Sequence, residues 1–295
     1  MIKSRVTKVV VPVAGLGTRG LPFTKAVPKE LLPIIDTPTI QFIVEEVISA
    51  GVDQVIFITS KGKSALEDYF DPSPQLEDWL RKKGKAELAD KLRDVAKLCE
   101  VISVRQKEPL GLGHAILCAR HIIKDERFAV CLGDEIFPDW DAKQEKPVLK
   151  SLIDAAVEYD TSVVGVVKIP KEETRSYGII DTGGTAPGDR PVKIHRTVEK
   201  PSPEAAPSHF AIIGRYVFEP ILLDQLKEIK PGMGGEIQLT DAMDRLAGLG
   251  RLHAVLATGL RYDIGNHFYY VKAQVDAALR RNDIAPRLRE YLKSL

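Results

Sequence analysis

Glycines and cations crowd the segment that follows the first strand-like run of the sequence. Val6–Val13 is rich in β-branched residues and leads directly into Ala14-Gly15-Leu16-Gly17-Thr18-Arg19-Gly20. Glycine lets backbone N–H groups approach an anion closely, and Arg19, followed by Lys25 and Lys29, adds positive charge. Because open α/β sheets bind ligands beyond the carboxyl ends of their strands, this pattern predicts a loop that binds a phosphate-bearing ligand.

Two familiar phosphate-binding motifs fit this sequence poorly. Gly15, Gly17 and Gly20 match the spacing of the dinucleotide fingerprint, but that fingerprint needs a helix that opens within the loop. Three prolines interrupt any such helix: Pro22, Pro28 and Pro33. Gly62-Lys63-Ser64 matches only the end of a Walker A loop, because Phe57 stands where its first glycine belongs. A nicotinamide-dependent dehydrogenase is therefore disfavoured, and the plain alternative is a surface loop with solvated cations.

Apolar runs predict the elements that must position this loop. In the first half, short β-branched runs at Val55–Thr59, Val101–Arg105 and Phe128–Leu132 alternate with helical patterns such as Pro38–Gly51. After about Lys150 the strand-like runs follow one another with few helices between them, which favours antiparallel pairing. These runs are Ser162–Ile169, Val192–Glu199 and Ala211–Phe218. We expect a Rossmann-like three-layer α/β/α fold around one mixed, mostly parallel sheet.

Composition narrows the class of protein further. The 295 residues include 44% hydrophobic and 28% charged residues, which is ordinary for a globular chain. Lys and Arg number 42 and Asp and Glu number 41, so the net charge of +1 predicts no general attraction to nucleic acid or to an anionic membrane. The three cysteines, Cys99, Cys118 and Cys131, have no CxxC spacing and no even count. Reduced thiols, no signal-peptide pattern and no apolar run near ~20 residues predict a cytoplasmic protein without a membrane span.

Six blocks of sequence carry a family resemblance. They are residues 14–19 (AGLGTR), 25–33 (KAVPKELLP), 106–115 (QKEPLGLGHA), 198–201 (VEKP), 234–241 (GGEIQLTD) and 261–265 (RYDIG). In this order, and over nearly the whole chain, they resemble the sugar-1-phosphate nucleotidylyltransferases, and within that family the bacterial enzymes that use UTP and glucose 1-phosphate. The resemblance implies a catalytic domain over residues 1–265, with a nucleotide half to about 150 and a sugar half from about 151. A C-terminal helical segment would follow at 266–295, and self-association as a homo-oligomer is expected.

The implied reaction joins UTP and glucose 1-phosphate to give UDP-glucose and pyrophosphate. An oxygen of the sugar phosphate attacks the α-phosphorus, and pyrophosphate leaves in line. The second pKa of a phosphate monoester is about 6, so the nucleophile is already an anion near neutral pH and needs no general base. Catalysis then consists of positioning two polyanions and neutralising their charge.

The resemblance also implies roles for individual residues. The cations expected to assist catalysis are Arg19, Lys29 and Lys200. Those expected to contact the nucleotide are Ala14, Gly15, Gly17, Thr18, Glu30, Gln106 and Gly111. Those expected to contact the sugar are Gly178, Glu199 and Lys200. The ligands expected for Mg²⁺ are Asp134 and Asp263. The amide of Gln106 offers both a donor and an acceptor to the uracil edge, and Mg²⁺ prefers a few carboxylates together with phosphate and water.

Some alternatives stay open on the sequence. The family often has a second Asp or an apolar residue where this chain has Glu135, which is a bystander, a water-mediated ligand or a change in metal preference. A thymidylyltransferase of the same fold is the nearest alternative function, although the Pro28-Lys29-Glu30 block and the charged helices over Gln75–Glu100 favour UTP. A non-catalytic nucleotide-sugar sensor is less favoured, because it should have lost Arg19, Lys29 or a metal-binding aspartate.

Overall fold

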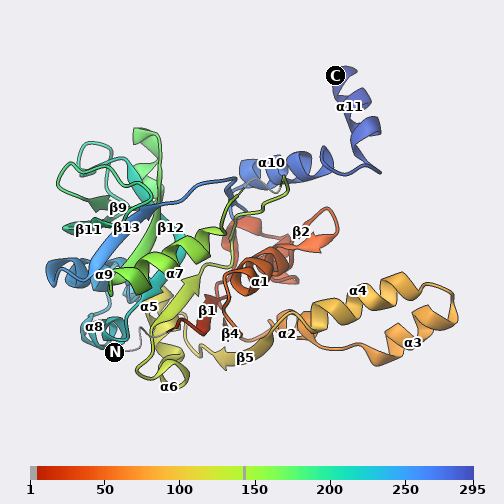
Figure 1. Cartoon of the computed structure of the whole chain (residues 1–295), viewed down its shortest axis with the longest axis horizontal. Helices are drawn as coiled ribbons and strands as arrows, with labels where there is room; N and C mark the ends of the chain where they lie inside the picture. The colour runs from red at the N-terminus through yellow and green to blue at the C-terminus, as the bar shows by residue number, and fades with distance from the viewer. Residues whose placement is uncertain (1–4, 142–143) are drawn as a thin grey trace.

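A mixed β-sheet forms the centre of the molecule (Figure 1). The computed structural model describes residues 5–141 and 144–295. Within these residues the main sheet has the strand order β10 (Val192–Lys193), β13 (Leu252–Leu256), β8 (Ser162–Lys168), β12 (Phe210–Phe218), β6 (Phe128–Cys131), β1 (Lys8–Pro12), β4 (Gln54–Thr59) and β5 (Glu100–Arg105). A hairpin of β9 (Gly178–Asp181) and β11 (Arg196–Glu199) joins it where β9 pairs with β12.

The direction of the strands changes at β12. Strands β6, β1, β4 and β5 run parallel to one another, whereas β12 is antiparallel to both β6 and β8. On the far side β13 is again parallel to β8. The parallel first half and the mixed second half therefore belong to one continuous sheet, as predicted.

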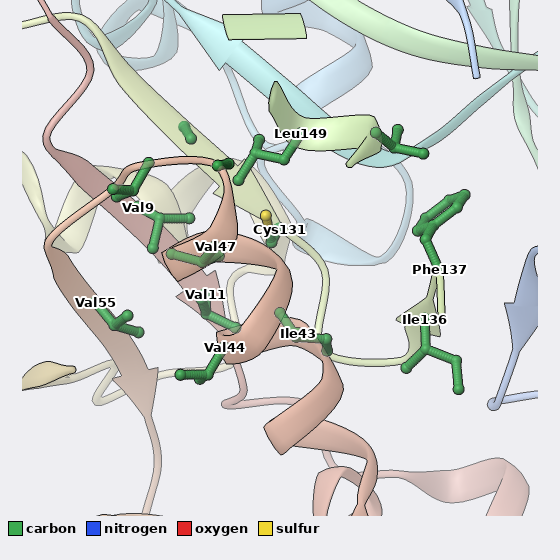
Figure 2. Packing of buried hydrophobic residues seen from close by; sticks show 14 of the residues in the cluster. Val9, Val11, Ile43, Val44, Val47, Val55, Cys131, Ile136, Phe137 and Leu149 are labelled. Carbon is green, nitrogen blue, oxygen red and sulfur yellow. The ribbon is translucent and has the colours of Figure 1, made fainter. Parts of the chain in front are cut away.

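Alternating side chains of the strands bury both faces of the sheet. Val9 and Val11 of β1 lie in one apolar cluster, and Val10 between them lies in another. Figure 2 shows Val9, Val11 and Val55 of the strands beside Val44 and Val47 of α1 (Thr39–Ser49). Successive strand residues point to opposite faces, so an unbroken β-branched run is what a sheet covered on both sides requires.

Helices cover the two faces. The first cluster contains side chains of α1, α2 (Ala65–Phe70), α7 (Val148–Glu158) and α10 (His267–Ala278). The second contains side chains of α5 (Gly111–Cys118), α6 (Arg120–Ile123), α8 (Ile221–Glu228) and α9 (Leu239–Gly248). The arrangement is the expected three-layer α/β/α fold.

Two helical segments extend away from the sheet (Figure 1). One is the hairpin of α3 (Pro74–Lys82) and α4 (Ala86–Ala96), in which Gly84, with a φ of +73°, lies between the two helices. The other is α11 (Ala285–Lys293), which has no buried residue. Over the part of the chain that the structure describes, no helix is both long and apolar enough to cross a bilayer.

One predicted strand is wrong in its extent. The run Val192–Glu199 divides into β10, which pairs with β13, and β11, which pairs with β9. Between them the Ile194 N–H still donates to Leu252 O, while the His195 N–H donates to Asp181 O. The backbone changes partner at this point, and an apolar pattern alone does not report which neighbour a strand pairs with. Two short strand pairs were also not predicted: β2 (Pro33–Ile34) with β3 (Thr37–Pro38), and β7 (Glu135–Ile136) with β14 (Tyr262–Asp263).

Candidate active site

The predicted phosphate loop and Asp134 emerge from neighbouring parallel strands. Strands β1 and β6 are parallel neighbours in which Val9 pairs with Ala129 and Val10 with Val130. The segments that follow the two strands therefore leave at the same edge of the sheet. The loop after β1 contains three single turns of 3-10 helix, η1 (Thr18–Gly20), η2 (Phe23–Lys25) and η3 (Lys29–Leu31), and no α-helix. That is the outcome expected from its prolines, and it places Lys29 beside the end of β6.

Lys29 forms an ion pair with Asp134. Its Nζ lies 2.7 Å from Asp134 Oδ2, and about a quarter of each side chain is exposed. Burial lowers the pKa of Lys29, but the Asp134 carboxylate outweighs burial and the net pKa is raised. Burial likewise raises the pKa of Asp134, and the Lys29 ammonium outweighs it, so the net pKa is lowered. Both groups are therefore held in their charged forms.

Arg19, Asp134 and Asp263 converge on the open side of Gly265. A Cβ atom built on Gly265 would lie 3.1 Å from Asp263 Oδ1, 3.2 Å from Arg19 Nη1 and 3.4 Å from Asp134 Oδ2. Strands β7 and β14 create this arrangement, because they pair immediately after Asp134 and at Asp263, and the Ile264 N–H donates to Asp134 O over 2.8 Å. A side chain at this position would require the three charged groups to shift by a few tenths of an ångström.

Asp263 carries a negative charge that its surroundings disfavour. Burial raises its pKa, and the nearby carboxylates of Asp134 and Glu135 raise it further. Its Oδ1 accepts a hydrogen bond of 3.0 Å from the Gly265 N–H. Within the described residues no group of three or more His, Cys, Asp or Glu side chains is arranged to hold a metal ion, so Asp134 and Asp263 form a pair rather than a complete cage.

A cavity of about 420 Å³ borders Asp134, and we call it the nucleotide-side cavity because residues predicted to contact the nucleotide line it. Five residues predicted to contact the nucleotide line it, namely Ala14, Gly15, Glu30, Gln106 and Gly111, together with Lys29 and Glu236. Gln106 is held in place by its neighbours: its Nε2 donates to Gly111 O over 3.1 Å and lies 3.0 Å from His114 Nδ1. His114 therefore orients the amide of Gln106.

Gly111 is required by its backbone and by its surroundings. Its φ of +90° is unfavourable for other residues, and a Cβ atom there would lie 2.7 Å from Glu236 Cβ. The Ile237 N–H donates to Leu110 O and the Gly113 N–H donates to Ile237 O, so the glycine turn pairs with the segment before α9. Residues far apart in the sequence thereby build one wall of the nucleotide-side cavity.

A second cavity, of about 440 Å³, also borders Asp134, and we call it the sugar-side cavity because residues predicted to contact the sugar line it. Arg19, Asp134, Asp263, Gly178 and Glu199 contribute to its lining. Gly178 and Glu199 are paired residues of β9 and β11, so two of the predicted sugar contacts face the cavity from one hairpin. The Thr240 hydroxyl donates to Glu199 Oε2 and orients that carboxylate.

Lys200 lies apart from the other expected cations. About half of its side chain is exposed, its Nζ lies 3.3 Å from Glu199 Oε1, and it does not line the sugar-side cavity. Its φ of +44° follows directly on the end of β11. The structure thus brings Arg19 and Lys29 to the carboxylates and leaves Lys200 at the rim beside Glu199.

A third cavity, of about 580 Å³, lies behind Arg19. Gly17 and Thr18 line it together with Arg19, Lys29 and Asp134, and Phe23, Ile264 and Tyr270 supply apolar walls. Gly17 and Thr18 therefore line this third cavity and not the nucleotide-side cavity. Asp134 lines all three cavities and is the point where they meet.

The sequence pattern missed two ion pairs that support the site. Lys63 Nζ lies 2.9 Å from Oε2 of the fully buried Glu30, and burial raises the pKa of Glu30 and lowers that of Lys63. Arg261 Nη2 lies 2.7 Å from Glu135 Oε1. Lys63 follows β4, whose carboxyl end lies at the same sheet edge as the loop that holds Glu30. This position after a strand is the one sequence signal that could have identified the Lys63–Glu30 pair.

Comparison with known proteins defines the class to which this fold and site belong. The family model for nucleotidyl transferases matches residues 8–279. The chain therefore belongs to the nucleotidyl transferase family.

Particular relatives are similar over their full length. The chain is 45% identical over 291 residues to the UTP–glucose-1-phosphate uridylyltransferase of Bacillus subtilis, covering 99% of this chain and 97% of that protein. It is also similar to the crystallised UDP-glucose pyrophosphorylase of Acinetobacter baumannii, with a TM-score of 0.89 and 33% identity over 98% of this chain and 99% of that one. A UDP-glucose pyrophosphorylase solved with UDP-glucose matches with a TM-score of 0.82 and 39% identity over 94% and 100% of the two chains.

Proposed function

We propose that this chain transfers the uridylyl group of UTP to glucose 1-phosphate, releasing pyrophosphate and forming UDP-glucose. The observation that carries the proposal is the position of Asp134, which lines both the nucleotide-side and the sugar-side cavity. Substrates bound in the two cavities would meet at this residue, where Arg19 and Asp263 also converge. The relatives named as uridylyltransferases and pyrophosphorylases support the choice of substrates.

The reaction needs charge neutralisation more than proton transfer. A phosphate oxygen of glucose 1-phosphate forms a bond to the α-phosphorus, the bond from that phosphorus to the oxygen bridging to the β-phosphate breaks, and pyrophosphate departs with the electron pair. The planar guanidinium of Arg19 can bridge two phosphate oxygens, and the ammonium of Lys29 adds a compact charge beside them. We infer that Arg19 binds the leaving group, and its position in the lining of both the sugar-side cavity and the cavity behind it supports this role.

The pair Asp134 and Asp263 fits a divalent cation. Burial and two neighbouring carboxylates raise the pKa of Asp263, so a positive charge between the aspartates would relieve an unfavourable arrangement. Two carboxylates suit Mg²⁺, which keeps phosphate and water as its other ligands. Mg²⁺ bound there would neutralise charge on the phosphates. Lys29, which pairs with Asp134 in the structure, would then be free to contact phosphate oxygens.

Substrate selection follows from the two cavities. We infer that Gln106 reads the uracil edge and that Glu30, held by Lys63, contacts the nucleoside, with backbone groups of Ala14, Gly15 and Gly111 beside them. On the other side the Glu199 carboxylate would accept hydrogen bonds from sugar hydroxyls, and Gly178 would offer backbone groups. Lys200 would bind the sugar phosphate after its side chain turns inward from the rim. Gly17 and Thr18 would contact the terminal phosphates rather than the base.

Location and assembly belong to the same proposal. Three free cysteines suit a reducing compartment, and we propose that the protein acts in the cytoplasm. We also propose that it self-associates, since Phe268 and Val271 of α10 and Tyr291 of α11 are exposed apolar side chains on neighbouring helices. Light scattering of the purified chain tests the second point.

The decisive experiment is pyrophosphate release with Mg²⁺, crossing UTP, dTTP, CTP, ATP and GTP against glucose 1-phosphate and galactose 1-phosphate. We expect release with UTP and glucose 1-phosphate. A preference for dTTP would make the protein a thymidylyltransferase with the same site. Binding of nucleotides without release in any combination would instead indicate a sensor.

A further inference from the structure

Arg261 joins the two halves of the site through two different interactions. Its Nη2 lies 2.7 Å from Glu135 Oε1, and its Nε lies 3.3 Å from Glu135 Oε2. On its other side the guanidinium carbon lies 5.1 Å from the centre of the Tyr177 ring. Arg261 precedes Asp263 by two residues, whereas Tyr177 precedes the sugar-side hairpin β9–β11.

Glu135 is fully engaged in holding this arrangement. It is 6% exposed, and its Oε2 also accepts a hydrogen bond of 3.0 Å from the Gly214 N–H, while its backbone O accepts one of 3.0 Å from Arg215 Nη2. Because the Glu135 carboxylate is bonded to an arginine and to a backbone N–H, it holds the neighbouring residue Asp134 in position. The ion pair with Arg261 gives this buried carboxylate a partner.

Tyr177 carries the other half of the contact. Its ring lines the sugar-side cavity, and its backbone O accepts the Lys200 N–H over 3.0 Å, next to the pair formed by Gly178 and Glu199. A flat guanidinium packed on the ring limits how far this hairpin can move from the aspartates. The contact between Arg261 and Tyr177 therefore connects the β9–β11 hairpin to the segment that carries Asp263.

We propose that Arg261 is a positioning residue that fixes the glucose-phosphate half of the site relative to Asp134 and Asp263, with Glu135 as its anchor and Tyr177 as its contact. This inference rests on the proposed function for the names of the two substrates. Arg261 lines none of the three cavities, so its effect on substrate passes through Tyr177 and Glu135.

The test uses the intact chain and substitutions that separate charge from shape. Arg261→Lys keeps the positive charge beside Glu135 but loses the flat face against Tyr177, and Tyr177→Leu removes that face from the other partner. The matched control is Arg280→Lys, because the Arg280 guanidinium lies 5.6 Å from the Trp140 ring and pairs with Asp141 in the same way, away from the three cavities.

We expect Arg261→Lys and Tyr177→Leu each to raise the KM for glucose 1-phosphate by about 10-fold, with the KM for UTP changed less than about 2-fold. The double variant should be no worse than either single variant, because one contact is lost in all three. Arg280→Lys should leave both KM values unchanged. A merely structural role would lower thermal stability in the Arg261 variant without this split between the two KM values.

Equal changes in both KM values, no change in either, or additive effects of the two substitutions would overturn the proposal. The wild-type protein reports separately on the proposed function. If it turned over a different nucleotide or sugar phosphate, the proposed function would fail, and the same comparison with that substrate pair would still decide the role of Arg261.

Discussion

The ammonium of Lys29 lies 2.7 Å from Oδ2 of Asp134, although 105 residues separate them in the sequence. The contact joins the loop after β1 to the segment after β6, and it forms because these strands are neighbours in the sheet. It keeps both groups charged at the point where the three cavities meet. Under the proposed function this ion pair would separate when phosphate enters, so that Lys29 contacts the phosphate and Asp134 the metal ion.

Removing either aspartate should nearly abolish turnover. We expect Asp134→Asn and Asp263→Asn each to lower kcat by about 100-fold or more, because each substitution removes a carboxylate proposed to hold the Mg²⁺ that neutralises the reacting phosphates. Pyrophosphate release measured over a range of Mg²⁺ concentrations checks this. Asp283→Asn, which changes an exposed carboxylate paired with Arg281, is the control. Full activity in both site variants would show that the carboxylates do not hold the metal.

Lys29 and Lys25 lie in the same loop, but only Lys29 should matter strongly for activity. We expect Lys29→Ala to reduce kcat/KM for UTP by about 100-fold, since a charge at the phosphates is lost. Lys25 is exposed and lines none of the three cavities, so Lys25→Ala should stay within about 2-fold of the wild-type value. Steady-state kinetics of the two variants measure the difference. Equal losses would mean that the loop acts through its overall charge rather than through Lys29.

A side chain at Gly265 should impair catalysis more than it impairs folding. A Cβ atom there would lie 3.1 to 3.4 Å from charged atoms of Asp263, Arg19 and Asp134, and these must shift to accommodate it. We expect Gly265→Ala to lower kcat by about 10- to 100-fold, because small displacements of reacting groups are costly, while its melting temperature changes little. Gly188→Ala, where no atom lies within 4 Å of the added carbon, is the matched control. Wild-type kcat in the Gly265 variant would contradict the described convergence.

Breaking the buried ion pair between Arg215 and Glu46 should destabilise the fold beneath the site. Arg215 is fully buried, and its Nη2 lies 2.7 Å from Glu46 Oε2 while Glu46 Oε1 accepts the Leu149 N–H. We expect Arg215→Ala to reduce the free energy of unfolding by about 3–5 kcal/mol, because it leaves an uncompensated carboxylate. The double variant Glu46→Gln/Arg215→Met, which keeps an acceptor for Leu149, should be more stable than Arg215→Ala. Urea unfolding measures both, and the reverse order would refute the argument.

His253 should make stability depend on pH. Burial, aided by the charge of Lys193, lowers its pKa below the ordinary value of 6.5, so the unfolded chain takes up the proton first as the pH falls. Stability from this residue is present above about pH 6.5 and is lost as the pH drops through its folded-state pKa. Unfolding between pH 5 and 8 should show a smaller acid-side loss in His253→Asn than in the wild type. His121→Asn, at an exposed position, should retain the loss.

Local pattern predicted much of this protein. The β-branched runs located β1, β4, β6, β8 and β12, because a strand covered on both faces needs continuous apolar residues. The run Val101–Arg105 likewise located β5, a partly exposed strand at the edge of the sheet. The prolines excluded an α-helix after β1, and the charged groups Arg19, Lys29, Asp134 and Asp263 could be singled out by their places after strands or within family blocks. These inferences depend on backbone geometry and residue type over a few neighbouring positions.

Tertiary structure decided which of these groups meet. Strand β6 lies between β1 and β12, and that order brings Asp134 to Lys29. The pairing of β7 with β14 brings Asp263 to Asp134 and Arg19. The Lys63–Glu30 and Arg261–Glu135 pairs, and the place of Lys200 at the rim, follow from the same order. Strand order depends on the total apolar surface that the whole chain buries when it folds. No short window of sequence contains the information needed to evaluate that total.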